Sequence, residues 1–219
     1  MVKYAYTKIN TKMKKVFKFF FIFLAVVAVI YVVLVIIRAF HFYNLDKTNE
    51  QVEKIHNTKL TMDDVMGKNL PSDPGAEADK TIQGIDANKN GIRDDVELAI
   101  FKAYPESAKT RAVLLQYALA LQMEVVQSVF NMETVTEVAT EQGRADTCLA
   151  DTLVPRKSPE SSREDVDMEK IEFFIKFIED RQINTDQRKK VRKNFYEHLG
   201  SYGESTNKNC DIDYLLLSN

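Results

Sequence analysis

The sequence has few of the residues on which enzyme chemistry most often depends. Its 219 residues include 3 histidines and 2 cysteines, and His198 is the only histidine after residue 56. It contains no phosphate-cradling glycine pattern, no Gly-x-Ser-x-Gly elbow and no His-Glu-x-x-His motif. These absences argue against the enzyme classes built on those motifs. Paired carboxylates remain open as acid-base groups, since 32 acidic residues always offer some pair.

A strong excess of positive charge is also lacking, because the formal net charge is -2. The charge is unevenly distributed: residues 1–38 hold seven Lys or Arg and no acid, which leaves 23 basic against 32 acidic residues in the remainder, a formal charge of -9. An acidic remainder has no general electrostatic reason to bind nucleic acid. We therefore expect no nucleic-acid partner, and we expect the two parts to lie in different environments.

One long uncharged apolar stretch, Phe19–Ile37, follows a cluster of lysines. As a helix it would be about 28 Å long, enough to span the hydrocarbon core with help from its flanks. A cleaved signal peptide is the alternative, but this stretch exceeds the usual apolar length of roughly 7–15 residues. The sequence therefore predicts a single-pass anchor that contacts the membrane through Phe19–Ile37. The lysines place the N-terminus in the cytoplasm and the residues after the span outside it.

Composition divides the chain into four parts. Residues 1–18 form a basic cytoplasmic N-terminus, and residues 19–38 form the transmembrane signal anchor. Residues 39–84 are predicted to be a tether, with a short amphipathic helix between Asn44 and Met66 followed by a loop rich in glycine, proline and charge. Residues 85–219 are predicted to form one small helical domain.

The periodicity of apolar residues in that domain predicts an all-α fold. Ser107 is a candidate N-cap for a helix that is apolar nearly all round and should be the most buried element. Gly143 is expected to end the helix before it, and Asn184 to begin the last one with Gln187 in a capping box. The expected helices are 95–103, 107–130, 134–142, 165–183 and one that begins at 184. In the fourth of these, a buried stripe is expected from Val166, Ile171, Phe174, Ile175 and Ile178, widened by Phe173 and Phe177.

The stretch from Asp86 to Glu97 has oxygen-bearing side chains at the spacing of a twelve-residue calcium loop. Such a loop takes ligands from positions 1, 3, 5, 7, 9 and 12 and has glycine at position 6 for a sharp turn, which here is Gly91. The predicted calcium ligands are the side chains of Asp86, Asn88, Asn90, Asp94 (through water) and Glu97, together with the backbone carbonyl of Ile92. The alternative is an Asn-Gly turn before a helix capped by Asp94 or Asp95, which needs no metal.

Only half of an EF-hand is present, because Pro71, Pro74, Gly75 and Gly84 exclude a long entering helix. A loop followed by one helix resembles the EF-hand-like loops of dockerins and other extracytoplasmic modules. The string from Gly84 to Glu97 is also similar to a signature of membrane-anchored proteins of gammaproteobacteria, over about Gln51 to Cys148. That resemblance implies no established activity. It implies an inner-membrane location with the C-terminal domain in the periplasm.

Only three of the predicted side-chain ligands are carboxylates, which indicates weak calcium affinity of about 10⁻⁴–10⁻³ M, as in extracellular modules. A structural ion is therefore expected. In an exported domain, the two cysteines, Cys148 and Cys210, are predicted to form a disulfide, with two buried thiols as the alternative if the domain is cytoplasmic. A basic cluster is a candidate partner patch, although such runs are usually solvated faces. It comprises Arg188, Lys189, Lys190, Arg192 and Lys193.

These features lead to three hypotheses about function. The first is a non-enzymatic, membrane-tethered module with a structural calcium site that binds another envelope protein or polymer. The second is an inhibitor or immunity protein against a periplasmic toxin or hydrolase. The third is an envelope enzyme that uses carboxylates. A cleft with two carboxyl groups of perturbed pKa would favour the enzyme.

The lysine asymmetry predicts that the C-terminal domain lies outside the cytoplasm. We expect a reporter enzyme that is active only outside the cytoplasm to be active when fused after Asn219. A reporter active only in the cytoplasm, fused at the same position, should be silent. The opposite pattern would overturn the predicted topology.

Overall fold

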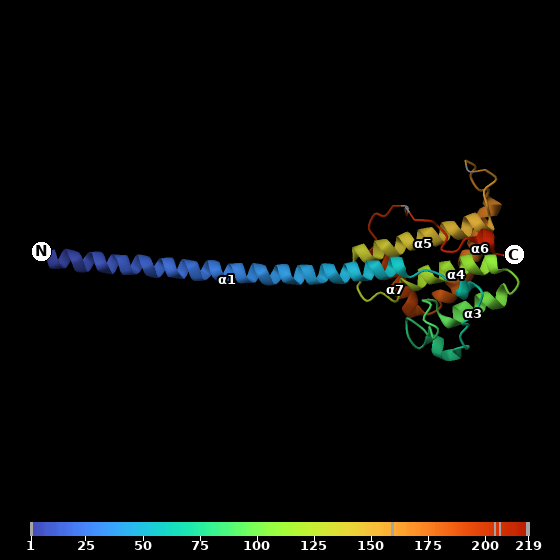
Figure 1. Ribbon diagram of the computed structural model, residues 1–219, viewed down its shortest axis with the longest axis horizontal. Coiled ribbons are helices and arrows are strands. Elements are labelled where there is room, and N and C mark those ends of the chain that lie inside the picture. The colour runs from blue at the N-terminus through green and yellow to red at the C-terminus, as the bar shows by residue number, and fades with distance from the viewer. Residues whose placement is uncertain (1, 159, 204, 206, 218–219) are drawn as a thin grey trace. The chain divides into compact units, whose positions relative to one another are not determined.

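The computed structural model describes residues 2–158, 160–203, 205 and 207–217, with side chains described from residue 13 onward. The chain separates into two compact units, Met1–Lys47 and Thr48–Asn219. Figure 1 shows the elements of both. The predicted all-α fold is confirmed, because the described residues contain helices and no strand.

The first unit is formed by the N-terminal part of helix α1 (Val2–Asn57). Within the described residues, α1 is one helix that is long and apolar enough to cross a membrane. The side chains of residues 13–47 are exposed, which suits contact with lipid. The sequence predicted a separate helix beginning near Asn44, whereas α1 continues unbroken to Asn57. The reason is that the first glycine or proline of the chain is Gly67, so nothing before it interrupts helical geometry.

The second unit begins at Thr48, whereas the sequence placed the start of the domain at residue 85. The last turns of α1 belong to its core, because Gln51 and Ile55 are buried. The Gln51 carboxamide oxygen accepts a hydrogen bond from the Ser128 hydroxyl at 2.6 Å, and the Thr48 hydroxyl accepts one from the Asn131 amide at 2.8 Å. These long-range contacts make part of the predicted tether a structural element of the domain.

Helix α4 (Ala108–Gln122) is the centre of this unit. All but two of its 15 residues are buried, as the apolar sequence predicted. It contacts α2 (Met62–Val65), α3 (Asp94–Ala103), α5 (Met132–Leu153) and α6 (Asp165–Gln182). Ser107 caps it by accepting the Thr110 N–H. The helix stops at Gln122 and not near Phe130, because the N–H groups of Glu124 and Val125 bond three residues back and tighten the turn.

Helix α5 continues through Gly143, which was expected to end it. Space around this glycine is open, and it lies on the exposed side of the helix. An exposed glycine in a helix costs only about 1 kcal/mol, and burial of the opposite face against α4 outweighs that cost. A capping box between Asn131 and Thr134 begins the helix.

Helix α6 begins at the predicted residue and ends one residue earlier than predicted, and its buried stripe is narrower than expected. Ile171 and Ile178 are buried, whereas Val166 and Phe173 are 58% and 63% exposed. Phe177 packs edge-on against Tyr104, with ring centroids 5.8 Å apart. Because Tyr104 covers only the C-terminal half of the stripe, the first turns of α6 stay open to solvent.

The N-cap of helix α7 (Asp186–Glu197) lies one residue later than predicted. Thr185 is the N-cap and accepts the Arg188 N–H, whereas the Asn184 side chain bonds Asp79 and Arg188. Two short 3₁₀ helices complete the fold: η1 (Gly75–Asp79) and η2 (Tyr214–Leu216).

The predicted disulfide joins Cys148 of α5 to Cys210 in the C-terminal segment. Polar contacts hold the same segment against the core: the Gln116 amide donates to the Asn209 carbonyl at 2.7 Å, and Arg144 donates to Asp211 at 2.8 Å. The bond closes a loop with a sequence separation of 62. In the chain-entropy model, such closure stabilises the fold by about 4 kcal/mol.

Candidate metal centre

The loop from Asp86 to Glu97 leads directly into α3, whose first turn supplies its last residues. The Asp94 N–H donates to the Ile85 carbonyl at 2.9 Å and closes the loop at its base. Asp94, Asp95 and Glu97 all lie in the first turn of α3, where negative charge interacts favourably with the helix dipole. The predicted helix start at residue 95 is therefore correct to within one position.

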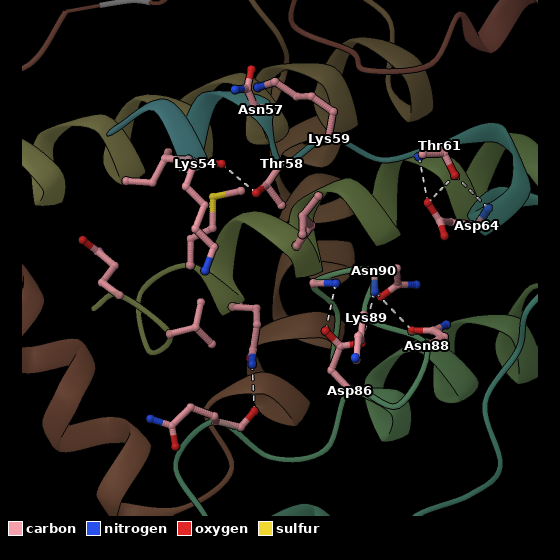
Figure 2. Close-up of a pocket in the computed structure, with 18 of the residues that line it drawn as sticks. Lys54, Asn57, Thr58, Lys59, Thr61, Asp64, Asp86, Asn88, Lys89 and Asn90 are labelled. Atoms are coloured by element: carbon pink, nitrogen blue, oxygen red, sulfur yellow. Dashed lines mark hydrogen bonds between the residues drawn. The ribbon is translucent and has the colours of Figure 1, made fainter. Parts of the chain in front are cut away.

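Four of the predicted ligands meet inside the loop. The Asp86 carboxylate accepts the N–H groups of Asn90 at 3.2 Å and Gly91 at 2.9 Å. The side-chain amides of Asn88 and Asn90 donate to different oxygens of Glu97, each at 3.0 Å. Figure 2 shows Asp86, Asn88 and Asn90 beside each other, with the Asn90 N–H between the side-chain oxygens of the other two. Residues at positions 1, 3, 5 and 12 are thus brought together.

The two remaining predicted ligands lie at the edge of this cluster. The Asp94 carboxylate accepts the Ala87 N–H at 3.0 Å. Ile92 has its side chain fully buried in the core, and its N–H donates to the Asn90 carboxamide oxygen at 2.9 Å. Burial of Ile92 anchors the middle of the loop to the domain.

Electrostatics in the loop are dominated by buried carboxyl groups without basic partners. Asp94 and Glu97 are each 1% exposed. Burial raises the pKa of Glu97 to about 7, opposed by the hydrogen bonds from the two asparagines, and burial also raises the pKa of Asp94. Across the described residues, neither these two acids nor Asp86 forms an ion pair with Lys, Arg or His. A buried carboxylate without such a partner is costly unless a cation or hydrogen bonds compensate it.

The acids alone do not form a metal cage. In the part of the chain that the structure describes, no group of three or more His, Cys, Asp or Glu side chains is placed to hold a metal ion. Any cation here would therefore depend on the oxygens of Asn88, Asn90 and the Ile92 carbonyl as well. All these donors are oxygen atoms, which suits a hard cation such as calcium.

Gly91 is required by both the turn and the packing. Its φ of +87° lies in the left-handed region that favours glycine. A Cβ atom at this position would lie 2.7 Å from Leu119 Cδ1 of α4. The loop therefore rests directly on the central helix.

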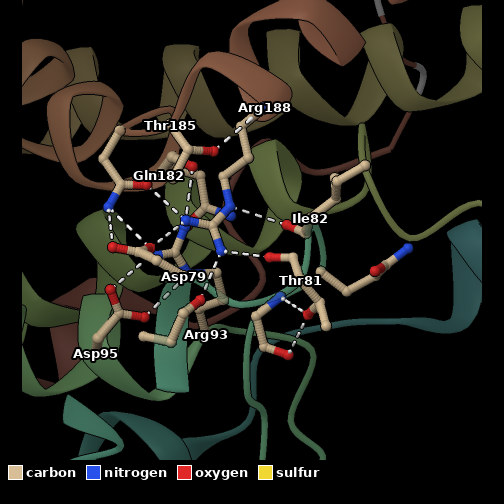
Figure 3. A network of polar contacts seen from close by, with 12 residues as sticks. Asp79, Thr81, Ile82, Arg93, Asp95, Gln182, Thr185 and Arg188 are labelled. Atoms are coloured by element: carbon tan, nitrogen blue, oxygen red, sulfur yellow. Dashed lines mark hydrogen bonds and ion pairs between the residues drawn. The ribbon is translucent and has the colours of Figure 1, made fainter. Parts of the chain in front are cut away.

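Two fully buried arginines hold the segment that enters the loop, as Figure 3 shows. Arg188 of α7 donates to the carbonyls of Ala78 at 2.7 Å, Thr81 at 3.0 Å and Ile82 at 2.9 Å, and it pairs with Asp79 at 2.6 Å. Its hydrogen bond to Asp79 lowers the pKa of that carboxyl group. These contacts explain how a segment with little regular structure is held in place.

Arg93 is the second of these arginines and lies within the loop itself. Its guanidinium bonds none of the predicted calcium ligands; it bonds Asp95, at 2.9 Å, and the Gln182 carbonyl, at 3.1 Å. The loop pattern in the sequence assigns Arg93 no role. The observed burial explains the position, since Arg93 ties the loop to the end of α6.

These contacts correct the prediction that the basic residues of α7 form one exposed patch. Arg188 is buried, so it cannot belong to an exposed surface. Arg192 pairs with Glu179 and lies 3.9 Å from Glu124. Lys189, Lys190 and Lys193 remain exposed. One side of α7 packs against the domain and uses its arginines internally, which a count of consecutive charges does not reveal.

Glu124 is a buried acid outside the loop that the sequence pattern did not identify. It accepts the Gln142 amide at 2.7 Å through Oε1, while its Oε2 is buried without a hydrogen-bond partner. Burial raises its pKa to about 7, and the nearby Arg192 opposes that shift. Its neighbours are Arg192 and Gln142, whereas those of Glu97 are Asn88 and Asn90. Glu97 and Glu124, whose pKa values are both raised to about 7, thus have separate environments.

Comparison with known proteins finds no matching family model, no matching curated protein and no matching solved structure.

The Arg188 contacts predict that this buried charge is essential for stability. Arg188→Ala should lower the free energy of unfolding by about 3–5 kcal/mol, because Asp79 and three carbonyls lose their partner. Denaturant unfolding of the full chain, followed by near-ultraviolet circular dichroism, measures the loss. Lys189→Ala, which alters the next residue on the exposed side, should change stability by less than about 0.5 kcal/mol. Equal stability of the two variants would contradict this assignment.

Proposed function

We propose that the protein is a membrane-tethered extracytoplasmic module, stiffened by a structural calcium ion, that binds another protein of the cell envelope. The observation that carries this proposal is the meeting of Asp86, Asn88, Asn90 and Glu97 at the start of α3. An apolar N-terminal helix of membrane-spanning length and a disulfide support it. Disulfides persist in oxidising compartments outside the cytoplasm.

The ion would be held by the side chains of Asp86, Asn88, Asn90 and Glu97, the Ile92 carbonyl and, through water, Asp94. When bound, calcium supplies positive charge to buried carboxylates that have no basic partner. Contacts with the rest of the domain position the loop without the ion: Gly91 packs on α4, and the two buried arginines hold the flanking segments. The expected consequence is a restrained first turn of α3 and a rigid surface beside it.

A binding role fits this arrangement better than a catalytic role. The side chains of the loop form hydrogen bonds with each other and with backbone N–H groups, so their role is to hold the loop in shape. The exported domain is acidic overall and is anchored by one helix, so it can present one surface to partners outside the membrane. The inner membrane, with the N-terminus in the cytoplasm and the domain in the periplasm, is the proposed location.

Calcium is expected to stabilise the domain. A ligand that binds only the folded state at ten times its Kd stabilises it by about 1.4 kcal/mol, which raises the Tm by about 3–6 °C at this size. Thermal unfolding of the full chain in 10 mM calcium and in chelator measures the difference. Asp86→Ala and Glu97→Gln should remove the response, and Glu133→Gln, an exposed acid on α5, should keep it. The same response in all four proteins would place any ion elsewhere.

Partner binding is expected to depend on the folded, calcium-loaded loop. Crosslinking of the tagged full chain in membranes should capture a discrete envelope protein. Chelation or Asp86→Ala should reduce the captured amount, and Glu133→Gln should not. Hydrolysis of peptidoglycan, lipid or peptide by the purified chain, abolished by changing one carboxylate, would instead identify an enzyme.

A further inference from the structure

A cavity of about 620 Å³ opens beside the proposed calcium loop. One wall is the end of α1 with the segment that follows it, from Gln51 to Thr61. A second wall is the first half of the loop, and the floor comes from α4 and the turn after it. This volume lies in the range of about 300–1,000 Å³ typical of ligand-binding pockets. The proposed function does not assign this cavity a role.

The uncommitted charges in the cavity walls are positive. Neither Lys54 nor Lys89 has an ion-pair partner among the residues that the structure describes, whereas Lys59 pairs with Glu141 at 2.6 Å. The two acids in the walls already have donors. Asp64 accepts the Thr61 N–H at 2.8 Å, and Asp86 accepts loop N–H groups. Two lysines are thus available to an anionic group.

The remaining wall groups are amides and aliphatic side chains. Gln127 has both polar atoms of its carboxamide buried without a hydrogen-bond partner, which is costly unless a ligand or water satisfies them. Ile55, Leu119 and Met123 are buried, and Val126 is 39% exposed at the edge. The described lining contains no aromatic side chain, so no surface is offered for stacking a planar ring. Amides, lysines and an aliphatic floor complement backbone groups, carboxylates and aliphatic side chains.

We propose that this cavity binds an acidic peptide segment of the partner, with aspartate or glutamate paired to Lys54 and Lys89 and an aliphatic side chain on the floor. This inference rests on the proposed function and names the site and the chemistry of its partner. Carboxylate-ammonium hydrogen bonds are stronger than neutral ones, and partial burial in a cavity reduces competition from water. The peptide backbone meets the wall amides.

Calcium and the peptide are linked through the shared wall. Asp86 lines the cavity and is also a proposed calcium ligand. Without the ion, its negative charge opposes an acidic ligand. With the ion, two positive charges are added to the loop, so the affinity for the peptide rises. By thermodynamic reciprocity, the peptide then tightens calcium binding by the same factor.

The test uses the full chain in phosphatidylcholine nanodiscs and a fluorescent hexapeptide of alternating aspartate and leucine. The control peptide has asparagine in place of each aspartate, and binding is measured by fluorescence anisotropy. We expect the acidic peptide to bind and the control not to bind. The double variant Lys54→Glu/Lys89→Glu should weaken binding by about ten- to a hundredfold, since two charge-assisted bonds are lost. Chelation should also weaken it.

Two further variants distinguish binding in this cavity from non-specific electrostatic binding and from an effect of misfolding. Lys102→Glu/Lys208→Glu reverses two exposed lysines that have no ion pair in the described residues, and it should leave binding unchanged. Val126→Trp blocks the mouth from a half-exposed position without changing charge, and it should abolish binding while the Tm stays the same. This variant keeps the test decisive if the Lys54/Lys89 variant fails to fold.

Three results would overturn this site. One is equal binding of both peptides, and another is equal binding by wild type and Val126→Trp. The third is no peptide binding, but binding of inorganic phosphate or phosphatidylglycerol vesicles that depends on Lys54 and Lys89. If crosslinking still captures a calcium-dependent partner in these cases, only the cavity assignment fails. If no partner is captured but the peptide binds here, the proposed function fails and the site remains.

Discussion

Enclosure of α4 is the constraint on which the rest of the domain depends. A helix that is apolar on nearly every side gains its stability only when other elements surround it, because burial of apolar surface contributes about 25 cal/mol per Å². Its few polar residues then anchor what lies around it. Gln116 holds the C-terminal segment, and Gln122 donates to the Gln83 carbonyl ahead of the loop. Arg111 donates to the carbonyls of Val65 and Tyr104. Core and loops are therefore organised by the same helix.

Charge is separated around the candidate metal centre. Arg93 and Arg188 bond backbone carbonyls and the acids Asp95 and Asp79, whereas the carboxylates among the predicted ligands are left with amide and N–H donors. If Arg93 turned toward Glu97, an internal ion pair would replace any need for a cation. The Asp95 and Gln182 contacts prevent this by holding the guanidinium on the opposite side. The proposed calcium function thus relies on contacts that involve none of its ligands.

The loop and the adjoining cavity share residues, and this gives the proposed function a physical route for regulation. Asp86 belongs to both, and Lys89 follows in the turn with a φ of +60°, which the surrounding hydrogen bonds maintain. A cation bound in the loop therefore changes the electrostatic potential in the cavity, because only this one turn separates the two sites. Extracytoplasmic calcium would then set how strongly the module holds an acidic partner.

Local pattern in the sequence determined the helical class, the membrane-length apolar helix, the start of α3, the Ser107 cap and the central place of α4, because each follows from spacing between neighbours along the chain. It also predicted the cysteine pair, which the structure confirms. Tertiary structure decided the rest. Gly143 lies inside α5 because packing on α4 outweighs its low helix propensity, and the domain begins at Thr48 because Gln51 and Ile55 are buried by distant segments. Arg188 is internal because carbonyls about 106 to 110 residues earlier surround it, a long-range relation that no local charge pattern contains.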